Sequence, residues 1–380
     1  MNRIARIPRA LAALVALLVS TGHVAAMDTN AKQAIIVEFD TGAVLYSKDA
    51  DSTMYPASMT KMMTAYLLFE QLKIGNLSLN DTIRVSEKAW RKGGSKMFVK
   101  VGDRVSVEDL LRGIVVQSGN DATIVVAEGI GGSESAFAEL MTEKAREIGM
   151  TNSTFHNASG WPDPDHVTTA RDLAILAERT IRDFPEYYHY YSELTYKYNN
   201  IKQGNRNPLL YQNLGADGLK TGYIKASGYG LTASAKRNDR RLVVVANGFS
   251  SVKERAIGSE RLLDWGFRTW NNYTLFKAGE TVTELPVWLG KSKSVPIVIK
   301  DKLVITIPRK SRSKMKVAVA YEEPIPAPIQ AGAQVATLVV TAPDADRVEV
   351  PLYADAHVPQ LGAVSRLGEA LRYLVWGDKF

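Results

Sequence analysis

The chain of 380 residues contains no cysteine. Disulfide bridges, thiol nucleophiles and thiolate metal sites are therefore excluded. Internal repeats and low-complexity tracts are also missing. With 46% hydrophobic and 23% charged residues, the composition is that of an ordinary globular protein, neither disordered nor membrane-spanning throughout. At this length we expect two or three domains and a sizeable core.

The excess of positive over negative charge is also small. The formal charge is +7, and residues 1–26 hold three arginines and no acidic residue, so the rest of the chain carries +4. An excess of this size does not indicate a nucleic-acid-binding protein.

The start of the chain has the pattern of a secretory signal peptide. Its basic beginning is followed by an apolar stretch over 10–19 and by small residues at 24–26. The apolar stretch is about half the roughly 20 residues that cross a bilayer, which disfavours an uncleaved membrane anchor. We therefore expect a signal peptide over 1–26, cleavage before Met27 and export from the cytoplasm.

The end of the chain predicts an amphipathic helix within 359–380. Its apolar residues recur at steps of three and four, while polar residues fall on the opposite side. The apolar positions are Leu361, Val364, Leu367, Leu371, Leu374 and Val375. Such a face packs on a core or lies on a membrane surface. The terminal position and the closing Trp376 and Phe380 favour the membrane surface.

Between the ends, the patterns predict a mixed α and β protein with an antiparallel sheet and helical clusters. A hairpin is expected over 34–48, around the turn residues Asp40-Thr41-Gly42. Helical spacing covers 59–72, 107–116, 122–130, 135–148, 170–181 and 254–269. Strands are expected at 218–224, 230–236 and 242–249.

After about residue 275 only short β-type runs between turn residues remain. We therefore predict a first domain over 27–275, a small all-β domain over 276–358 and the terminal helix over 359–380. The basic segment 309–314 is expected to be a solvated hairpin tip, and contact with an anionic surface such as lipid is the alternative.

The first candidate for chemistry is Ser58-Met59-Thr60-Lys61, which follows Pro56 and begins an apolar helix. A spacing of three residues places Ser58 and Lys61 on one helix face, with the serine near the positive end of the helix dipole. A serine hydroxyl needs a base to become a nucleophile, and a lysine with a lowered pKa can be that base.

Two further motifs follow in the order of the chain. Ser118-Gly119-Asn120 lies in the break between two predicted helices, where a loop can present both polar side chains. Lys220-Thr221-Gly222 lies in a predicted strand. Alternation there directs Lys220 and Gly222 to one face and Thr221 to the other, unless the strand twists or bulges.

In this order the three motifs are those of class A β-lactamases and penicillin-binding proteins. The chain resembles, more specifically, the low-molecular-mass penicillin-binding proteins that are D-alanyl-D-alanine carboxypeptidases. Residues 55–61, 156–160, 169–173 and 217–222 all look like landmarks of that family. The resemblance covers nearly all of the chain after the leader. It implies an α/β (α+β) penicillin-binding or β-lactamase-like transpeptidase fold with a β-rich C-terminal domain and a terminal helix.

The resemblance also implies the reaction. Ser58 would attack the carbonyl between the last two D-alanines of a peptidoglycan stem peptide, with Lys61 accepting its proton. D-Alanine would leave, an acyl-enzyme would remain, and β-lactam antibiotics would acylate the same serine. No cofactor or metal is implied. The expected location is the periplasm, with the terminal helix on the outer face of the inner membrane.

The other motif residues take roles from the same resemblance. Ser118 would relay a proton to the leaving amine, and Asn120 would hold the amide of the acyl side chain. The Lys220-Thr221-Gly222 motif would bind the terminal carboxylate, with Lys220 also helping to keep Lys61 neutral. The backbone N–H groups of Ser58 and Tyr223 would form the oxyanion hole. Some relatives carry histidine in place of Tyr223, which bears on substrate preference.

Several alternatives remain open. A Ser/His/Asp hydrolase would use one of the histidines at 156, 166, 189 and 357, but no Gly-x-Ser-x-Gly elbow is present. His156 and His166 with the acidic loop between them could form a metal site, although such loops are usually ordinary turns. A β-lactamase of class A would need a Glu-x-x-Leu-Asn segment, which is absent between Asn120 and Lys220. A cross-link endopeptidase shares all the motifs, and a non-catalytic wall-binding scaffold would not be labelled by penicillin.

Overall fold

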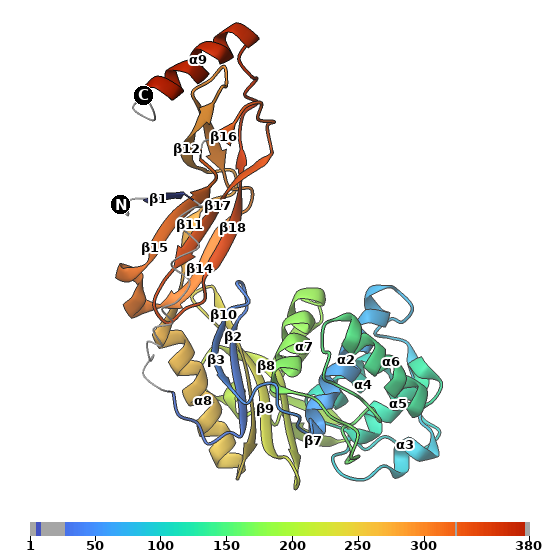
Figure 1. Cartoon of the computed structure of the whole chain (residues 1–380). Helices are drawn as coiled ribbons and strands as arrows, with labels where there is room; N and C mark the ends of the chain where they lie inside the picture. The colour runs from blue at the N-terminus through green and yellow to red at the C-terminus, as the bar shows by residue number, and fades with distance from the viewer. Residues whose placement is uncertain (1–4, 9–26, 324, 377–380) are drawn as a thin grey trace. The chain divides into compact units, whose positions relative to one another are not determined.

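The computed structural model describes residues 5–8, 27–323 and 325–376 (Figure 1). The chain divides into two compact units. The N-terminal unit is Met27–Arg268, and the C-terminal unit is Thr269–Phe380 together with Met1–Ala26. Apart from Ala5–Pro8, the predicted signal peptide lies outside the described residues.

A five-stranded antiparallel sheet forms the centre of the N-terminal unit. Its order is β3-β2-β10-β9-β8. The strands are β2 (Gln33–Glu38), β3 (Val44–Lys48), β8 (Ala216–Ile224), β9 (Gly228–Arg237) and β10 (Arg240–Phe249). These are the hairpin and the three strands that the sequence predicted, and β8, which carries the Lys-Thr-Gly motif, is at one edge.

Helices cover both faces of this sheet, so its central strands are apolar almost throughout. Helix α7 packs on one face and α8 on the other, where Gly266 of α8 lies against Leu242 and Ile36 (Figure 1). The helices of the unit are α2 (Lys61–Lys73), α3 (Glu87–Arg91), α4 (Val107–Val115), α5 (Asn120–Gly131), α6 (Glu134–Glu147), α7 (Ala170–Asp183) and α8 (Val252–Thr269). The predicted helices are therefore all present, and α3 is an addition.

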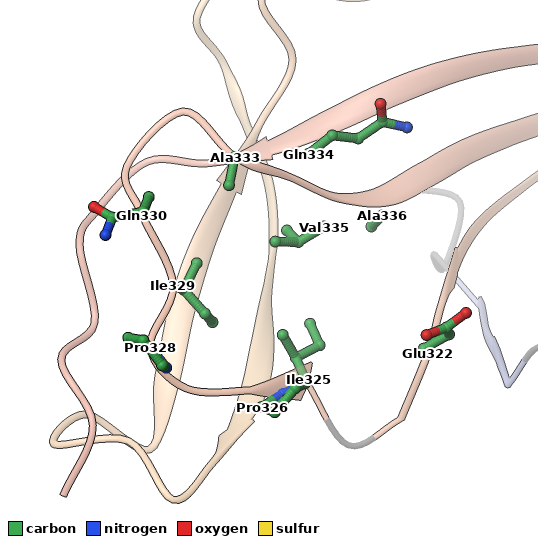
Figure 2. Close-up of a pocket in the computed structure, with 10 residues that line it drawn as sticks. All are labelled: Glu322, Ile325, Pro326, Pro328, Ile329, Gln330, Ala333, Gln334, Val335 and Ala336. Atoms are coloured by element: carbon green, nitrogen blue, oxygen red, sulfur yellow. The ribbon is translucent and has the colours of Figure 1, made fainter.

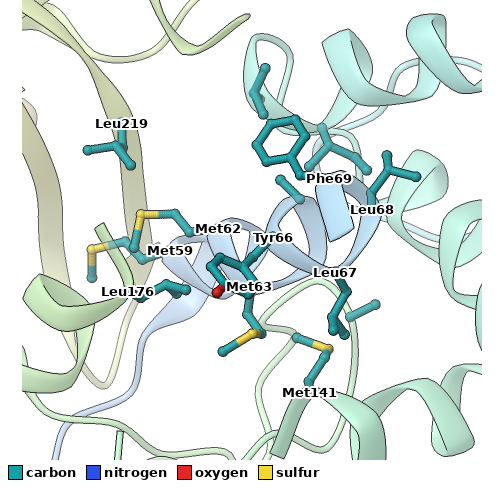
Figure 3. Close-up of a cluster of buried hydrophobic side chains, with 14 of the residues drawn as sticks. Met59, Met62, Met63, Tyr66, Leu67, Leu68, Phe69, Met141, Leu176 and Leu219 are labelled. Atoms are coloured by element: carbon teal, nitrogen blue, oxygen red, sulfur yellow. The ribbon is translucent and has the colours of Figure 1, made fainter. Parts of the chain in front are cut away.

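Helix α2 is buried on all sides over its first nine residues. It packs against α4, α5, α6 and α7. Figure 3 shows its apolar side chains clustered with Met141 of α6, Leu176 of α7 and Leu219 of β8. A helix that is apolar all round needs such enclosure. Because the whole core surrounds α2, the residues at its beginning are held in a fixed place.

Short elements connect the larger ones. They are the 3-10 turns η1 (Ala57–Thr60), η2 (Tyr188–Ser192) and η3 (Pro208–Tyr211), and the paired strands β4 (Thr82–Arg84) with β5 (Arg104–Ser106) and β6 (Thr195–Tyr198) with β7 (Ile201–Gly204).

The C-terminal unit is rich in strands, as the prediction of a C-terminal β domain requires, and has a core of its own. Its larger sheet has the order β1-β15-β17-β18-β13-β12-β16, and β11 pairs with β14 in a second, two-stranded sheet. The strands are β1 (Ala5–Pro8), β11 (Trp270–Phe276), β12 (Thr281–Trp288), β13 (Ser294–Val298), β14 (Leu303–Pro308), β15 (Lys316–Tyr321), β16 (Ile325–Pro326), β17 (Gln334–Thr341) and β18 (Val348–Ala354).

The prediction of a hairpin tip at 309–314 is wrong. This segment is a 3-10 turn, η4 (Arg309–Lys314), between two strands that belong to different sheets. Strand β14 pairs with β11, a strand that the sequence reading missed because it follows α8 without a turn residue. Within η4, Lys310 forms an ion pair of 2.9 Å with Asp344.

Two further features complete the C-terminal unit. A hollow of about 560 Å³ is lined by Ile325, Ile329, Val335 and their neighbours, and holds none of the predicted site residues (Figure 2). The predicted terminal helix is present as α9 (Ala363–Trp376). Val364, Leu367 and Leu371 on its apolar side are exposed.

Candidate active site

Ser58 and Lys61 meet at the beginning of α2. Lys61 Nζ donates a hydrogen bond of 2.8 Å to Ser58 Oγ and another of 2.8 Å to the carbonyl oxygen of Ser159. Lys61 is fully buried, whereas Ser58 is partly exposed. Ser58 lies in η1, one 3-10 turn before the α-helix begins, and the three-residue spacing still brings both groups together. The amine is thus protected from water, while the hydroxyl can be reached.

The surroundings lower the pKa of Lys61 to about 7. Burial is the main cause, because it disfavours the charged ammonium. The positive charges of Arg206 and Lys92 lower the pKa further, and the negative charge of Asp121 opposes them. Near neutral pH a large part of the lysine is therefore an uncharged amine that can accept a proton.

The loop from His156 to His166 holds the Ser58 turn in place. Gly160 has φ +76°, and a Cβ there would lie 1.7 Å from the carbonyl oxygen of Ala57, so only glycine fits. His166 Nε2 lies 2.9 Å from Oγ1 of Thr60, which is in η1. The loop therefore contacts the turn through both backbone and side chains.

Both ring nitrogens of His166 form hydrogen bonds, one within the loop and one to the turn. Nδ1 accepts a 3.2 Å hydrogen bond from the backbone N–H of His156, which leaves Nε2–H to donate to Thr60. Burial, with the nearby His156, lowers the pKa of His166 to about 4, so the ring is neutral. Over 27–323 and 325–376, no three His, Asp or Glu side chains lie close enough together to hold a metal ion. The contacts of His166 thus favour an ordinary structural loop over the alternative of a metal site at His156 and His166.

Ser118 stands out by its conformation and its hydroxyl. Its φ is +60°, in the left-handed region that non-glycine residues adopt rarely. Its Oγ is buried and has no hydrogen-bond partner within the described part of the chain. A buried hydroxyl without a partner is costly. It is therefore available to a group that enters the site.

Asn120 begins α5 and is tied to the loop over 93–99. Its Nδ2 donates to the carbonyl oxygen of Gly93 at 2.9 Å, and its backbone N–H donates to Ser95 at 2.8 Å. The next residue, Asp121, accepts hydrogen bonds from three successive backbone N–H groups of that loop, at Met97, Phe98 and Val99. The Ser-x-Asn motif and this loop thus form one unit.

The Lys-Thr-Gly motif lies directly against the Ser58 turn. A Cβ at Gly222 would lie 2.7 Å from the carbonyl oxygen of Pro56, so glycine is what lets β8 approach this closely. Lys220 pairs across the sheet with Thr232, whose hydroxyl contacts the sulfur of Met59 at 3.5 Å. Lys220 and Gly222 therefore share the face that meets η1, as the alternation predicted.

Lys220 is one of a group of basic side chains, of which Lys61 and Arg255 are also buried, whereas Arg206 is exposed. Burial lowers its pKa well below the usual value, and Lys61, Arg206 and Arg255 lower it further. Arg206 donates to Ser95 Oγ, and Arg255 of α8 is almost completely buried. The Nε atom of Arg255 has no hydrogen-bond partner in the described residues. So much positive charge in one place favours a bound anion such as a carboxylate.

Arg206 and Arg255 were not predicted from the sequence. Arg206 belongs to a polar loop before η3, and Arg255 lies on a helix that packs on the sheet. Neither forms a motif with Ser58, Ser118 or Lys220. Only the folded arrangement gives them a connection to the site.

Tyr223 is half exposed at the end of the motif. Its ring stacks on Tyr229 of β9 with 4.1 Å between the ring centres. Alternation places Tyr223 on the same face of β8 as Thr221, opposite to that of Lys220. The side chain of Tyr223 thus borders the motif.

Together these groups can carry out acyl transfer. The accessible hydroxyl of Ser58 contacts the buried amine of Lys61, whose pKa is near neutrality. Ser118 provides a second hydroxyl without a hydrogen-bond partner in the described residues, and the basic side chains around Lys220 can bind a carboxylate.

Residues 20–250 match a family model described as peptidase S11, D-alanyl-D-alanine carboxypeptidase, and residues 270–360 match the C-terminal domain of penicillin-binding protein 5. D-alanyl-D-alanine carboxypeptidase DacC of Escherichia coli K12 is 38% identical over 323 residues, which are 83% of this chain and 81% of the relative.

Solved structures agree with these matches. Penicillin-binding protein 5 from Haemophilus influenzae superimposes with a TM-score of 0.80 and 35% identity, over 89% of this chain and all of that chain. Penicillin-binding protein D2 from Listeria monocytogenes, solved in its ampicillin-bound form, has a TM-score of 0.59 and 28% identity, over 64% of this chain and 99% of that chain.

Proposed function

This chain belongs to the D-alanyl-D-alanine carboxypeptidase family of serine peptidases, and we propose that Ser58 is the residue that attacks its substrate. The protein is a hydrolase of peptidoglycan, with the penicillin-binding fold of its family. The contact between Ser58 Oγ and Lys61 Nζ carries the proposal, because it joins a partly exposed hydroxyl to a fully buried amine.

Acylation follows from the geometry at Lys61. The neutral amine takes the proton of Ser58 as Oγ bonds to the carbonyl carbon between the two terminal D-alanines. The C–N bond then breaks, the nitrogen of the leaving D-alanine gains a proton through Ser118, and the peptide remains as an ester on Ser58. A water molecule hydrolyses that ester. The unpaired hydroxyl of Ser118 supports its part as the proton relay.

The remaining residues bind and orient the substrate. Lys220 and Thr221, with Arg206 and Arg255 close to Lys220, would hold the terminal carboxylate. Asn120 would hold the amide of the acyl segment. The N–H groups of Ser58 and Tyr223 would stabilise the oxyanion, and the close approach at Gly222 supports this pairing of η1 with β8.

β-Lactams would acylate the same serine. The ampicillin-bound relative supports this, and we expect hydrolysis of the penicilloyl ester to be slow, because the glutamate segment of class A β-lactamases is absent. Cleavage of cross-links next to D-alanine remains the alternative activity, since it would use the same groups.

The site of action would be the periplasm. Cleavage of 1–26 would leave the catalytic domain over 27–275 and the β-rich domain over 276–358, with 359–380 as a surface anchor. The exposed apolar side chains of α9 support a helix that lies on the outer face of the inner membrane. None of the described helices is long and apolar enough to cross a bilayer.

Release of D-alanine tests the nucleophile. The chain from Met27, incubated with a stem pentapeptide ending in D-Ala-D-Ala, should release D-alanine, and its Ser58→Ala variant should release at least 10³-fold less, the order expected for loss of a nucleophile. Retained release by the variant would overturn the assignment of Ser58. Release by neither protein would favour the endopeptidase or scaffold alternatives.

A further inference from the structure

A lysine and a tryptophan from two separate loops meet beside the motif residues. Lys92 follows α3, and its Nζ lies 4.4 Å from the centre of the Trp161 ring. At that distance the ammonium is attracted by the face of the ring. Trp161 keeps 43% of its surface exposed, and Lys92 is half-buried. The pair therefore joins the two loops and still faces solvent.

The pair borders the site on the side of Asn120. A Cβ at Gly94 would lie 2.7 Å from Nδ2 of Asn120 and 3.2 Å from the Trp161 ring. On its other side, Trp161 follows Gly160, which packs on the carbonyl of Ala57. The tryptophan thus lies between the loop that holds Asn120 and the turn that carries Ser58.

The charge of Lys92 has no carboxylate partner. The negative charge of Glu134 acts on Lys92, but Glu134 pairs with Lys88 at 2.8 Å and also accepts a weak hydrogen bond from the backbone N–H of Ala158. Within 27–323, no ion pair involves Lys92. The charge reaches the reaction centre, because it contributes to the lowered pKa of Lys61. An unmatched, half-buried cation at the rim of a site can attract an anionic ligand.

We propose that Lys92 and Trp161 form a specificity-determining rim that recognises a carboxylate on the acyl segment of the substrate. The carboxylate would belong to the residue before the two D-alanines, because Asn120 holds that part of the chain in the proposed function, on which this inference rests. The substrate class is then an acidic peptide ending in D-Ala-D-Ala. Trp161 fixes the ammonium and covers the aliphatic part of the bound residue.

Two matched peptides test the rim. They are blocked tetrapeptides that end in D-Ala-D-Ala and differ only in glutamate or glutamine before the two D-alanines. For a partly solvated ion pair of about 1 kcal/mol, kcat/KM for the glutamate peptide should exceed that for the glutamine peptide about fivefold. In Lys92→Gln the ratio should fall to about one, and in Trp161→Leu it should fall at least twofold. Lys100→Gln, an exposed lysine a few residues farther along the chain, should leave the ratio unchanged.

The ratio separates recognition from other effects. Loss of Lys92 also raises the pKa of Lys61, but this acts equally on both peptides. Rates of acylation by benzylpenicillin and by its α-carboxy derivative provide a second pair, which differ by one carboxylate on the acyl side chain. The preference should weaken in 0.5 M salt, because partly exposed charges are screened.

The outcomes also separate this inference from the proposed function. An equal ratio in the wild type and Lys92→Gln, for both peptides and penicillins, would overturn the rim while release of D-alanine continues. If Ser58→Ala still turned over both peptides, the nucleophile would be wrong instead, and the ratio would still report on Lys92.

Discussion

A lysine can be the base for a serine only when its amine is uncharged, and burial at Lys61 provides this condition. The ammonium of Lys61 loses its hydration because the side chain is buried in the core around α2, and the positive charges of Arg206 and Lys92 repel it. Ser58, at 2.8 Å, remains in contact with solvent. The difference in burial between two residues three positions apart thus supports the proposal that Lys61 is the base and Ser58 the nucleophile.

The pKa of about 7 at Lys61 predicts the pH dependence of acylation. Only the neutral amine accepts a proton, so the rate constant for acylation by a penicillin should rise about tenfold per pH unit below 7 and level off above it. Stopped-flow measurements over pH 5 to 9 would check this. Lys92→Gln removes a repelling charge and should move the midpoint to higher pH. A rate that falls from pH 6 to 8 would contradict the role of Lys61.

Packing between secondary-structure elements positions Ser58 more than the conformational preference of its own segment does. The turn η1 is held between the loop 156–166 and the edge of β8, and at both contacts a glycine allows the backbones to touch, at Gly160 and Gly222. Side chains at either position would push the elements apart. The distance from Ser58 to the basic side chains that are proposed to bind the substrate carboxylate therefore depends on two missing Cβ atoms.

Gly160→Ala tests that dependence. The new Cβ meets the carbonyl of Ala57, and φ is +76°, so we expect a loss of about 2–4 kcal/mol in stability and at least tenfold slower acylation. Gly132→Ala is the matched control, because its φ is +73° and nothing lies within 4 Å of a Cβ there. It should cost about 1 kcal/mol and leave acylation unchanged. Thermal melts and penicillin acylation rates give both quantities. Similar behaviour of the two variants would contradict the close contact.

Local signals predicted the elements well, and tertiary contacts explain what they missed. Periodicity gave α2, α5 and the sheet strands, because apolar spacing is written in the chain itself. Spacing also gave the contact between Ser58 and Lys61. The prediction of a hairpin tip at 309–314 was wrong because β14 pairs with β11 and not with the next strand. No turn residue separates β11 from α8, so the sequence did not indicate that strand. Arg206, Arg255 and Lys92 carry no motif, and folding alone brings their charges to the site.

At the scale of the whole molecule, two compact units and a terminal helix have different tasks in this account. The N-terminal unit holds every proposed catalytic residue, and the C-terminal unit has a separate core. Exposure of the apolar side chains of α9 to water is unfavourable, and such a face is typical of a helix that lies on a membrane surface. Attachment there would keep the enzyme close to newly made peptidoglycan.

Flotation with anionic phospholipid vesicles tests the anchor. The chain from Met27 should bind, and a form ending at Pro359 should not. Leu367→Glu places a charge on the apolar side and should weaken binding about tenfold or more, consistent with about 1.5–3 kcal/mol for a buried leucine. Ser365→Glu adds the same charge on the polar side and should have a much smaller effect. Equal binding of the full chain and the form ending at Pro359 would rule out α9 as the anchor.

The central claim is that Ser58 forms the covalent intermediate. Intact-mass spectrometry of the chain from Met27 after brief exposure to benzylpenicillin should show one added penicilloyl group, and peptide mapping should locate it on Ser58. Ser58→Ala should show no adduct, and Lys61→Ala should acquire it at least 10³-fold more slowly. An adduct on another residue, or an unchanged adduct in Ser58→Ala, would contradict the account.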